Sequence, residues 1–229
     1  MVAIFKYIER NMRNNKKKYS PSTIKKLEAK TTNQEEFIRS LIENIVTICY
    51  GPAGSGKSYL SIGISCHHLH DKKIEKVVVA KPIIGCGNEL GSLPGDVEGK
   101  IHPYMVPSLD YFRLFLGQQF SNNIHKNIEL YPIELIRGHT YHNAYMILEE
   151  AQNCTPHQIK LFLSRIGRNS RAIIIGDNKQ TDIYNNGLEF CIQYFKNIKN
   201  VGLVEFNTND IIRNGIIPHI LEVFEKNGV

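Results

Sequence analysis

The segment GPAGSGKS, Gly51 to Ser58, has the spacing GxxxxGK[ST] and lies between an apolar run and a helical pattern. Its glycines allow successive backbone N–H groups to point at one anion, and the helix start adds partial positive charge. Lys57 is expected to reach the β- and γ-phosphates, and the Ser58 hydroxyl to bind Mg²⁺. A glycine turn without a ligand would not require this strand–loop–helix order. The residues predicted to enclose the phosphates are Gly51, Pro52, Ala53, Gly54, Ser55, Gly56, Lys57, Ser58 and Tyr59.

Two neighbouring carboxylates follow a second apolar run, in the segment YMILEEAQN. Glu149 is expected to hold Mg²⁺ through water, and Glu150 to orient and polarise the attacking water. Two acids can also end a strand at the surface without any function. The phosphate loop earlier in the chain favours the functional interpretation.

A third polar cluster ends the run IIIGDNKQTD. In a parallel sheet, ligands gather at the carboxyl ends of the strands. Asp177 and Gln180 are therefore candidates for sensing the γ-phosphate, and a plain polar turn is the alternative.

The elements that must position these residues alternate along the chain. Apolar runs predict strands, amphipathic patterns predict helices, and Thr31 or Thr32 is expected to cap the first helix. This order predicts an α/β fold with a mostly parallel sheet and helices on both faces. Residues 1–30 are expected to form a basic, partly mobile arm, and residues 31–229 a single domain. The predicted strands are 45–50, 76–82, 143–151, 171–177 and 201–206; the predicted helices are 31–45, 57–70, 108–120, 155–167 and 187–198, and residues 83–107 show little regular pattern.

Composition narrows the cellular setting. No run of about 18 apolar residues predicts a membrane span, and the charged N-terminus does not resemble a secretory signal, so a cytoplasmic location is expected. Five scattered cysteines without a CxxC pair favour buried thiols over a zinc site or disulfides. The net charge of +6 admits an anionic partner, although a run such as Lys16–Lys18 is usually just solvated.

Four segments in this order, GPAGSGKS, LGSLPGD, ILEEAQN and GDNKQTD, resemble the PhoH family of P-loop ATPases. The resemblance covers about residues 31–220 and implies a RecA-like core, related to superfamily one helicases, that binds ATP and Mg²⁺. It further implies that Gln34 reads the adenine edge and that Arg213 neutralises charge on the γ-phosphate. Arg137 is implied to serve either a neighbouring subunit's site or nucleic acid.

The sequence departs from that family's pattern at three positions. Glu149 replaces the usual aspartate, Lys81 replaces an arginine and Asn214 replaces a histidine. The extra methylene at position 149 moves a carboxylate by roughly a bond length, enough to disturb catalysis. ATP and Mg²⁺ binding is expected to persist, because Lys57, Ser58 and the loop amides are intact.

The predicted function is an ATPase coupled to nucleic acid, either RNA or single-stranded DNA. One RecA-like domain would need other subunits to complete its site, so a homo-oligomer is expected. The segment with Lys100, His102 and Tyr104 suits either a nucleic-acid strand or an oligomer contact. Two alternatives stay open: a nucleotide-dependent switch with weak hydrolysis, and a small-molecule kinase, which would need an arginine-rich lid that this sequence lacks.

Overall fold

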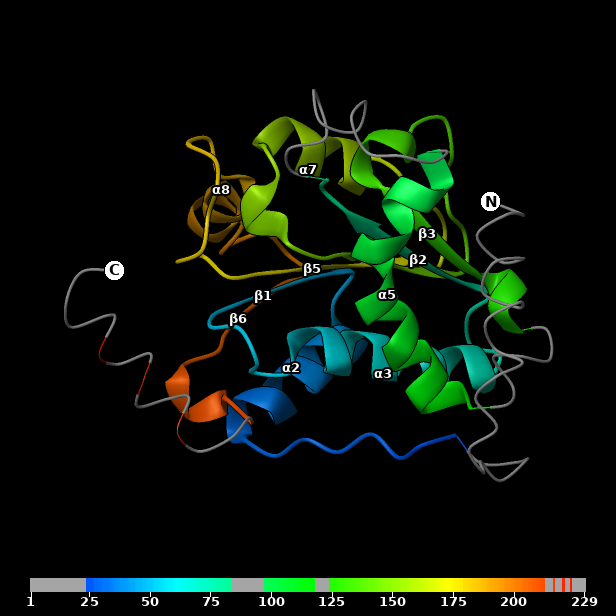
Figure 1. Ribbon diagram of the computed structural model, residues 1–229, viewed down its shortest axis with the longest axis horizontal. Coiled ribbons are helices and arrows are strands. Elements are labelled where there is room, and N and C mark those ends of the chain that lie inside the picture. The colour runs from blue at the N-terminus through cyan, green and yellow to red at the C-terminus, as the bar shows by residue number, and fades with distance from the viewer. Residues whose placement is uncertain are drawn as a thin grey trace.

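The computed structural model describes residues 24–83, 97–117 and 124–212, together with residues 216, 220 and 223. Its centre is a six-stranded sheet in which every pair of neighbouring strands is parallel, in the order β3-β2-β4-β5-β1-β6 (Figure 1). The strands are β1 Val46–Tyr50, β2 Lys76–Lys81, β3 Ile128–Pro132, β4 Ala144–Leu148, β5 Arg171–Gly176 and β6 Val201–Glu205. The helices are α2 Thr32–Glu43, α3 Lys57–His70, α5 Val97–Leu116, α7 Pro156–Leu163 and α8 Gly187–Tyr194.

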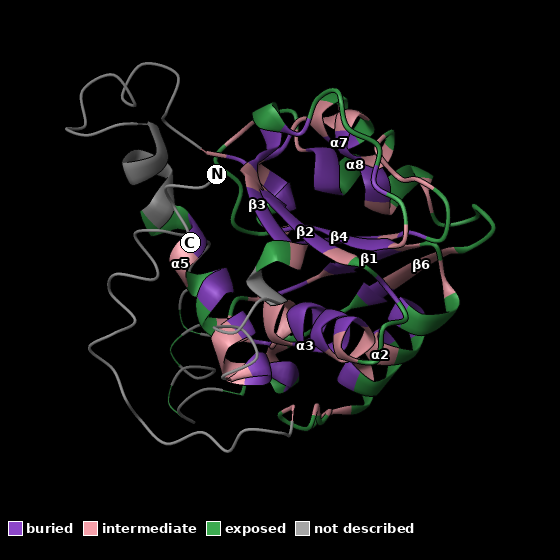
Figure 2. Ribbon diagram, turned by 90° about the vertical axis from the view of Figure 1, so that its right-hand side faces the viewer, coloured by how far each residue is buried: buried purple, intermediate pink, exposed green. Residues whose placement is uncertain are grey.

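Helices cover both faces of the sheet. In Figure 1, α2 and α3 lie below the strands, and α7 and α8 lie above them. Two apolar cores result, one containing Phe37, Leu60 and Phe112 and the other containing Met146 and Phe162. The central strands are buried on both faces (purple in Figure 2), which explains why their sequences are continuous apolar runs. The predicted fold class is thereby confirmed.

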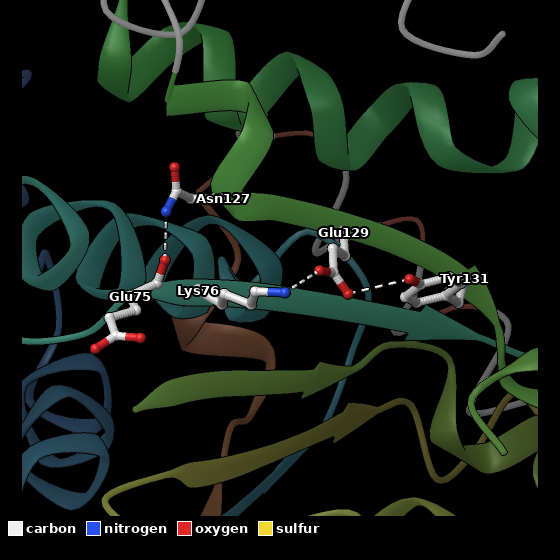
Figure 3. Close-up of polar contacts among 5 residues, drawn as sticks. All are labelled: Glu75, Lys76, Asn127, Glu129 and Tyr131. Atoms are coloured by element: carbon white, nitrogen blue, oxygen red, sulfur yellow. Dashed lines mark hydrogen bonds and ion pairs between the residues drawn. The ribbon is translucent and has the colours of Figure 1, made fainter. Parts of the chain in front are cut away.

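Strand β3 is absent from the sequence-based expectation, because its sequence IELYP places a glutamate in the middle of a short apolar run. Glu129 is nevertheless buried, and its Oε1 lies 2.6 Å from the Lys76 Nζ of the neighbouring strand β2. Its Oε2 accepts a hydrogen bond of 3.0 Å from the Tyr131 hydroxyl, whose pKa is raised by burial (Figure 3). At the start of the same pair of strands, Asn127 donates to the carbonyl of Glu75. Glu129 therefore occupies a buried strand position at which the sequence pattern favours an apolar residue, and Lys76 compensates its charge.

We expect Lys76→Met to lower the free energy of unfolding by about 1–2 kcal/mol. It leaves the buried Glu129 carboxylate without its cation, and the partial exposure of Lys76 limits the cost. Urea unfolding measures the change. Lys26→Met is the matched control, because the Lys26–Glu28 pair is exposed on both sides. Equal midpoints for the two variants would contradict the assigned role of Lys76.

Helix α5 begins eleven residues earlier than the predicted helix at 108–120, so residues 97–107 are helical rather than irregular. Pro103 and Pro107 lie inside it and hide the helical pattern, since proline lacks the N–H that a helix interior uses. Packing outweighs this loss: Met105 and Phe112 on this helix are buried against the core that α3 also covers. The helix ends before Gly117, which has a left-handed backbone conformation.

The described part of the predicted arm packs onto the domain. Residues 24–30 run alongside α3 and α5, where the Lys25 N–H donates to the Phe115 carbonyl and Leu27 approaches Gly63. The four cysteines in the described ranges are buried and free, as expected. Within those ranges, no helix combines the length and the apolar character that crossing a membrane requires.

Candidate functional site

The glycine loop joins β1 to α3 at the carboxyl end of the sheet. Gly51, Gly54 and Gly56 have φ angles of +134°, +81° and +94°, a region that favours glycine. At Gly51, a Cβ atom would lie 2.1 Å from the backbone oxygen of Phe206, which follows β6. Because glycine has no side chain, the loop backbone at Gly51 can pack directly against the backbone of Phe206.

Lys57 extends back into this loop. Its Nζ donates to the carbonyls of Gly51 (2.6 Å) and Pro52 (2.8 Å), and lies 3.3 Å from the Ser55 hydroxyl. Burial lowers the pKa of this ammonium, and nearby negative groups that include the Asp177 carboxylate oppose the shift. The structure thus holds a partly desolvated cation at the centre of the loop.

The two acids that follow β4 have different surroundings. Glu149 is only 3% exposed, and its Oε2 lies 2.9 Å from Lys81 Nζ and accepts a 2.5 Å hydrogen bond from the Ser108 hydroxyl. Glu150 is exposed and has a left-handed backbone conformation, with φ 56°. Its Oε2 accepts a hydrogen bond of 2.7 Å from the Gln152 side-chain amide. Glu149 is therefore held by an ion pair and a hydrogen bond inside the protein, whereas Glu150 lies at the surface.

Strand β5 lies between β1 and β4, so its tip connects the loop with the acids. The Asp177 carboxylate accepts the Ala53 N–H at 3.1 Å, and the Asp177 N–H donates to Gln152 Oε1 at 3.0 Å. Because Gln152 also donates to Glu150, a chain of hydrogen bonds runs from the glycine loop to the second acid. Gln180 is exposed on the same turn.

Helix α2 supports the loop from behind. Gln34 is 1% exposed; its Nε2 donates to the Ser55 carbonyl at 2.9 Å, and its Oε1 accepts the Lys30 N–H at 2.8 Å. A primary amide still has one hydrogen and one lone pair beyond these two bonds. Reading of adenine by Gln34 stays a prediction that would use this remaining capacity.

The segment after β6 contacts both the loop and α2. The Ile212 N–H donates to the Gly54 carbonyl at 3.2 Å. The buried Asp210 carboxylate accepts hydrogen bonds from the side chains of Thr31, the cap of α2, and Asn33. Arg213 and Asn214 lie outside the described residues, so the predicted role of Arg213 stays a prediction.

One cavity of about 590 Å³ brings most of the predicted residues together. Its volume is typical of a small-molecule site. Three predicted loop residues do not line the cavity and instead make hydrogen bonds within the loop or to Lys57: Gly51, Pro52 and Ser55. Arg137 does not line the cavity either; it is exposed in the connection before β4. The predicted residues that line the cavity are Gln34, Ala53, Gly54, Gly56, Lys57, Ser58, Tyr59, Glu149, Glu150, Asp177 and Gln180.

Among the residues that the sequence did not predict for this site, two hold its acids in place. Gln152, which connects Asp177 with Glu150, follows the acid pair directly, and that proximity is a usable signal. Ser108 lies on α5, far along the chain from Glu149, and carries no signal in the sequence. Lys81 stands out in the sequence only as a departure, and it proves to be the partner of Glu149.

The residues present fit a magnesium nucleotide. The glycines of the loop have positive φ angles that let its backbone curve around the Lys57 ammonium. Ser58 and Glu149 line the same cavity and carry the hard oxygen ligands that Mg²⁺ prefers.

Known proteins of similar sequence are PhoH-like proteins. A PhoH-like protein of Bacillus subtilis is 35% identical over 207 residues, which is 88% of this chain and 65% of the relative. One of Synechocystis is 33% identical over 203 residues, 86% of this chain and 62% of the relative. The chain thus spans slightly less than two thirds of the length of these relatives.

A solved structure shares the fold. The large terminase of a thermophilic bacteriophage, in complex with ADP, superposes with a TM-score of 0.53 at 12% identity, over 83% of this chain and 49% of the terminase. The fold is that of a P-loop NTPase with a RecA-like core. The PhoH family, described as PhoH-like protein, matches residues 26–225. The chain therefore belongs to the PhoH-like protein family.

Proposed function

We propose that this P-loop NTPase domain binds ATP with Mg²⁺, hydrolyses it, and is stimulated by single-stranded nucleic acid. The observation that carries the proposal is the single cavity that joins Lys57 and Ser58 of the loop to Glu149 and Glu150 of β4. A phosphate cradle, a cation and two acids in one cavity are the parts that phosphoryl transfer to water requires. The ADP bound by the terminase of similar fold supports an adenine nucleotide.

In this proposal, each group has one task. Lys57 exchanges the carbonyls of Gly51 and Pro52 for phosphate oxygens, and the loop amides hold the same phosphates. Bound Mg²⁺ would neutralise charge on the phosphates, with Ser58 and Glu149 as the residues that hold it. Glu150 accepts the hydrogen bond of the attacking water, and Gln152 fixes the orientation of that carboxylate.

Two features support coupling to nucleic acid. The chain has a net charge of +6, and Tyr104 on α5 is 42% exposed, a surface on which a base could stack. Completion of the nucleotide site by a second copy of this chain is also part of the proposal. The nucleotide chemistry points to the cytoplasm as the place of action.

The experiment is an ATPase assay with and without Mg²⁺, and with and without single-stranded RNA or DNA, at two salt concentrations. Hydrolysis should require Mg²⁺ and rise with nucleic acid, more strongly at low salt. The Lys57→Ala variant supplies the background rate. Hydrolysis that persists in Lys57→Ala would refute the site, and a rate insensitive to both nucleic acids would refute the coupling.

One observation favours a second candidate, a nucleotide-dependent switch with slow hydrolysis. Glu149 is longer than the aspartate usual in the family, and Lys81 already holds its Oε2, so only one of its carboxylate oxygens is left for the metal. A single-turnover assay separates the two functions. Tight ATP binding without hydrolysis over many minutes would favour the switch.

A further inference from the structure

We propose that Lys81 and Ser108 are positioning residues that orient the Glu149 carboxylate and thereby place metal binding under the control of helix α5. The inference rests on the proposed function in one respect, the role of Glu149 toward Mg²⁺. It assigns the two residues to a task that the sequence did not indicate for either.

Both residues act on the same oxygen atom. Lys81 Nζ and Ser108 Oγ lie 2.9 Å and 2.5 Å from Glu149 Oε2. In the described part of the chain, no hydrogen bond to Oε1 is found, and Glu149 lines the cavity. With Oε2 held from two sides, the carboxylate is fixed about its terminal torsion, which is otherwise broad. Oε1 is then the oxygen that serves a metal-bound water.

Burial makes this arrangement rigid. The side chains of Lys81 and Glu149 are only 11% and 3% exposed. An ion pair removed from water is costly to break, because separation leaves an uncompensated buried charge. Ser108 is 1% exposed, so its hydroxyl has little access to water as an alternative partner.

Helix α5 supplies one of the two contacts and touches the residue that makes the other. Ser108 lies on this helix, and Lys81 Nζ also lies 3.3 Å from the carbonyl of Tyr104, one turn earlier. The ammonium is therefore shared between α5 and Glu149. A displacement of α5 would move Ser108 away from Oε2, so the position of this helix determines whether the carboxylate is held from both sides.

The test is the Mg²⁺ dependence of nucleotide binding, followed with a fluorescent ADP analogue. Ser108→Ala should raise the Mg²⁺ concentration for half-maximal effect about 10-fold or more, since partners that orient metal ligands commonly contribute this much. Affinity for the analogue in EDTA should change less than about twofold, because the loop amides and Lys57 are untouched. Thermal unfolding shows that the variant is folded.

Ser65→Ala is the matched control. Ser65 is a fully buried helical serine whose hydroxyl donates to the Ser61 carbonyl at 2.7 Å, away from the cavity. Its Mg²⁺ dependence should equal that of the parent. As a second pair, Lys81→Met should behave like Ser108→Ala, and Lys81→Arg should retain most of the parental response because arginine can form a charge-assisted hydrogen bond to the same carboxylate.

The outcomes separate this inference from the proposed function. The positioning role is refuted if analogue binding by the parent depends on Mg²⁺ and both variants, Ser108→Ala and Lys81→Met, show the same Mg²⁺ dependence as the parent. The proposed function then stands. If the parent binds the analogue with no response to Mg²⁺, the proposed metal role fails instead. A loss of binding in EDTA for Ser108→Ala would show general damage to the site and would also overturn the inference.

Discussion

Replacing Glu150 with glutamine should lower the rate of ATP hydrolysis by about 10²–10⁴-fold, the range for removing a general base. Of the two acids that follow β4, Glu149 is buried against Lys81, whereas Glu150 is exposed and hydrogen-bonded to the neutral Gln152 amide. Glu150 is therefore the carboxylate that no cation holds, and it can accept a hydrogen bond from the attacking water. Glutamine has nearly the same shape and its oxygen can still accept from Gln152, so the fold and ATP affinity should be preserved.

Steady-state hydrolysis and binding of a fluorescent ATP analogue should be measured on the same preparation. Glu134→Gln is the control: Glu134 is exposed on the connection after β3 and accepts from Gln158, outside the cavity. It should leave both quantities unchanged. Turnover within about threefold of the parent in Glu150→Gln would remove Glu150 from the role of base.

The second large effect is expected for Gly51→Ala, which should lower the free energy of unfolding by about 3–5 kcal/mol, combining backbone strain with overpacking. The added Cβ would lie 2.1 Å from the Phe206 oxygen, and φ is +134°. Because the obstacle is backbone rather than a flexible side chain, β6 and the loop must separate. Nucleotide affinity should fall at the same time, since the loop carries the phosphate-binding amides.

Gly138→Ala isolates the contribution of backbone strain. Gly138 also has a positive φ, +81°, but nothing lies within 4 Å of the Cβ position. It should cost about 1–2 kcal/mol and leave nucleotide binding intact. Urea unfolding of the two variants gives the comparison. If both lose the same stability, the contact between Gly51 and Phe206 does not determine the geometry of the loop.

Most of the fold could be predicted because buried parallel strands appear in a sequence as continuous apolar runs, and five of the six strands do so here. Strand β3 was not predicted because the charge of Glu129 is compensated by Lys76 on the adjacent strand, and these two residues are 53 positions apart in the sequence. The first half of α5 was not predicted because Pro103 and Pro107 disfavour a helix locally. Packing against the core outweighs this local preference.

The site also has residues that the sequence reveals and residues that it does not. The loop and the acids could be found from the sequence because each is a local pattern, and the parallel topology brings them together. The partners of Glu149 could not, since Lys81 and Ser108 reach it from other elements of the chain. Lys81 and Glu149, two separate departures in the sequence, thus form one ion pair. The roles of Arg137, Arg213 and Gln34 stay predictions.

The contacts of Asp210 determine which part of this chain can serve as an independent unit. Its carboxylate joins Thr31 and Asn33 across nearly 180 positions, and two residues later Ile212 binds the Gly54 carbonyl. A shortened version that stops at β6 would keep every strand of the sheet but would lose the contacts of Asp210 and Ile212 that support the phosphate loop. Engineered fragments, fusions or rearranged termini should therefore retain both Thr31 and Ile212, or the recombinant piece will fold around an unsupported loop.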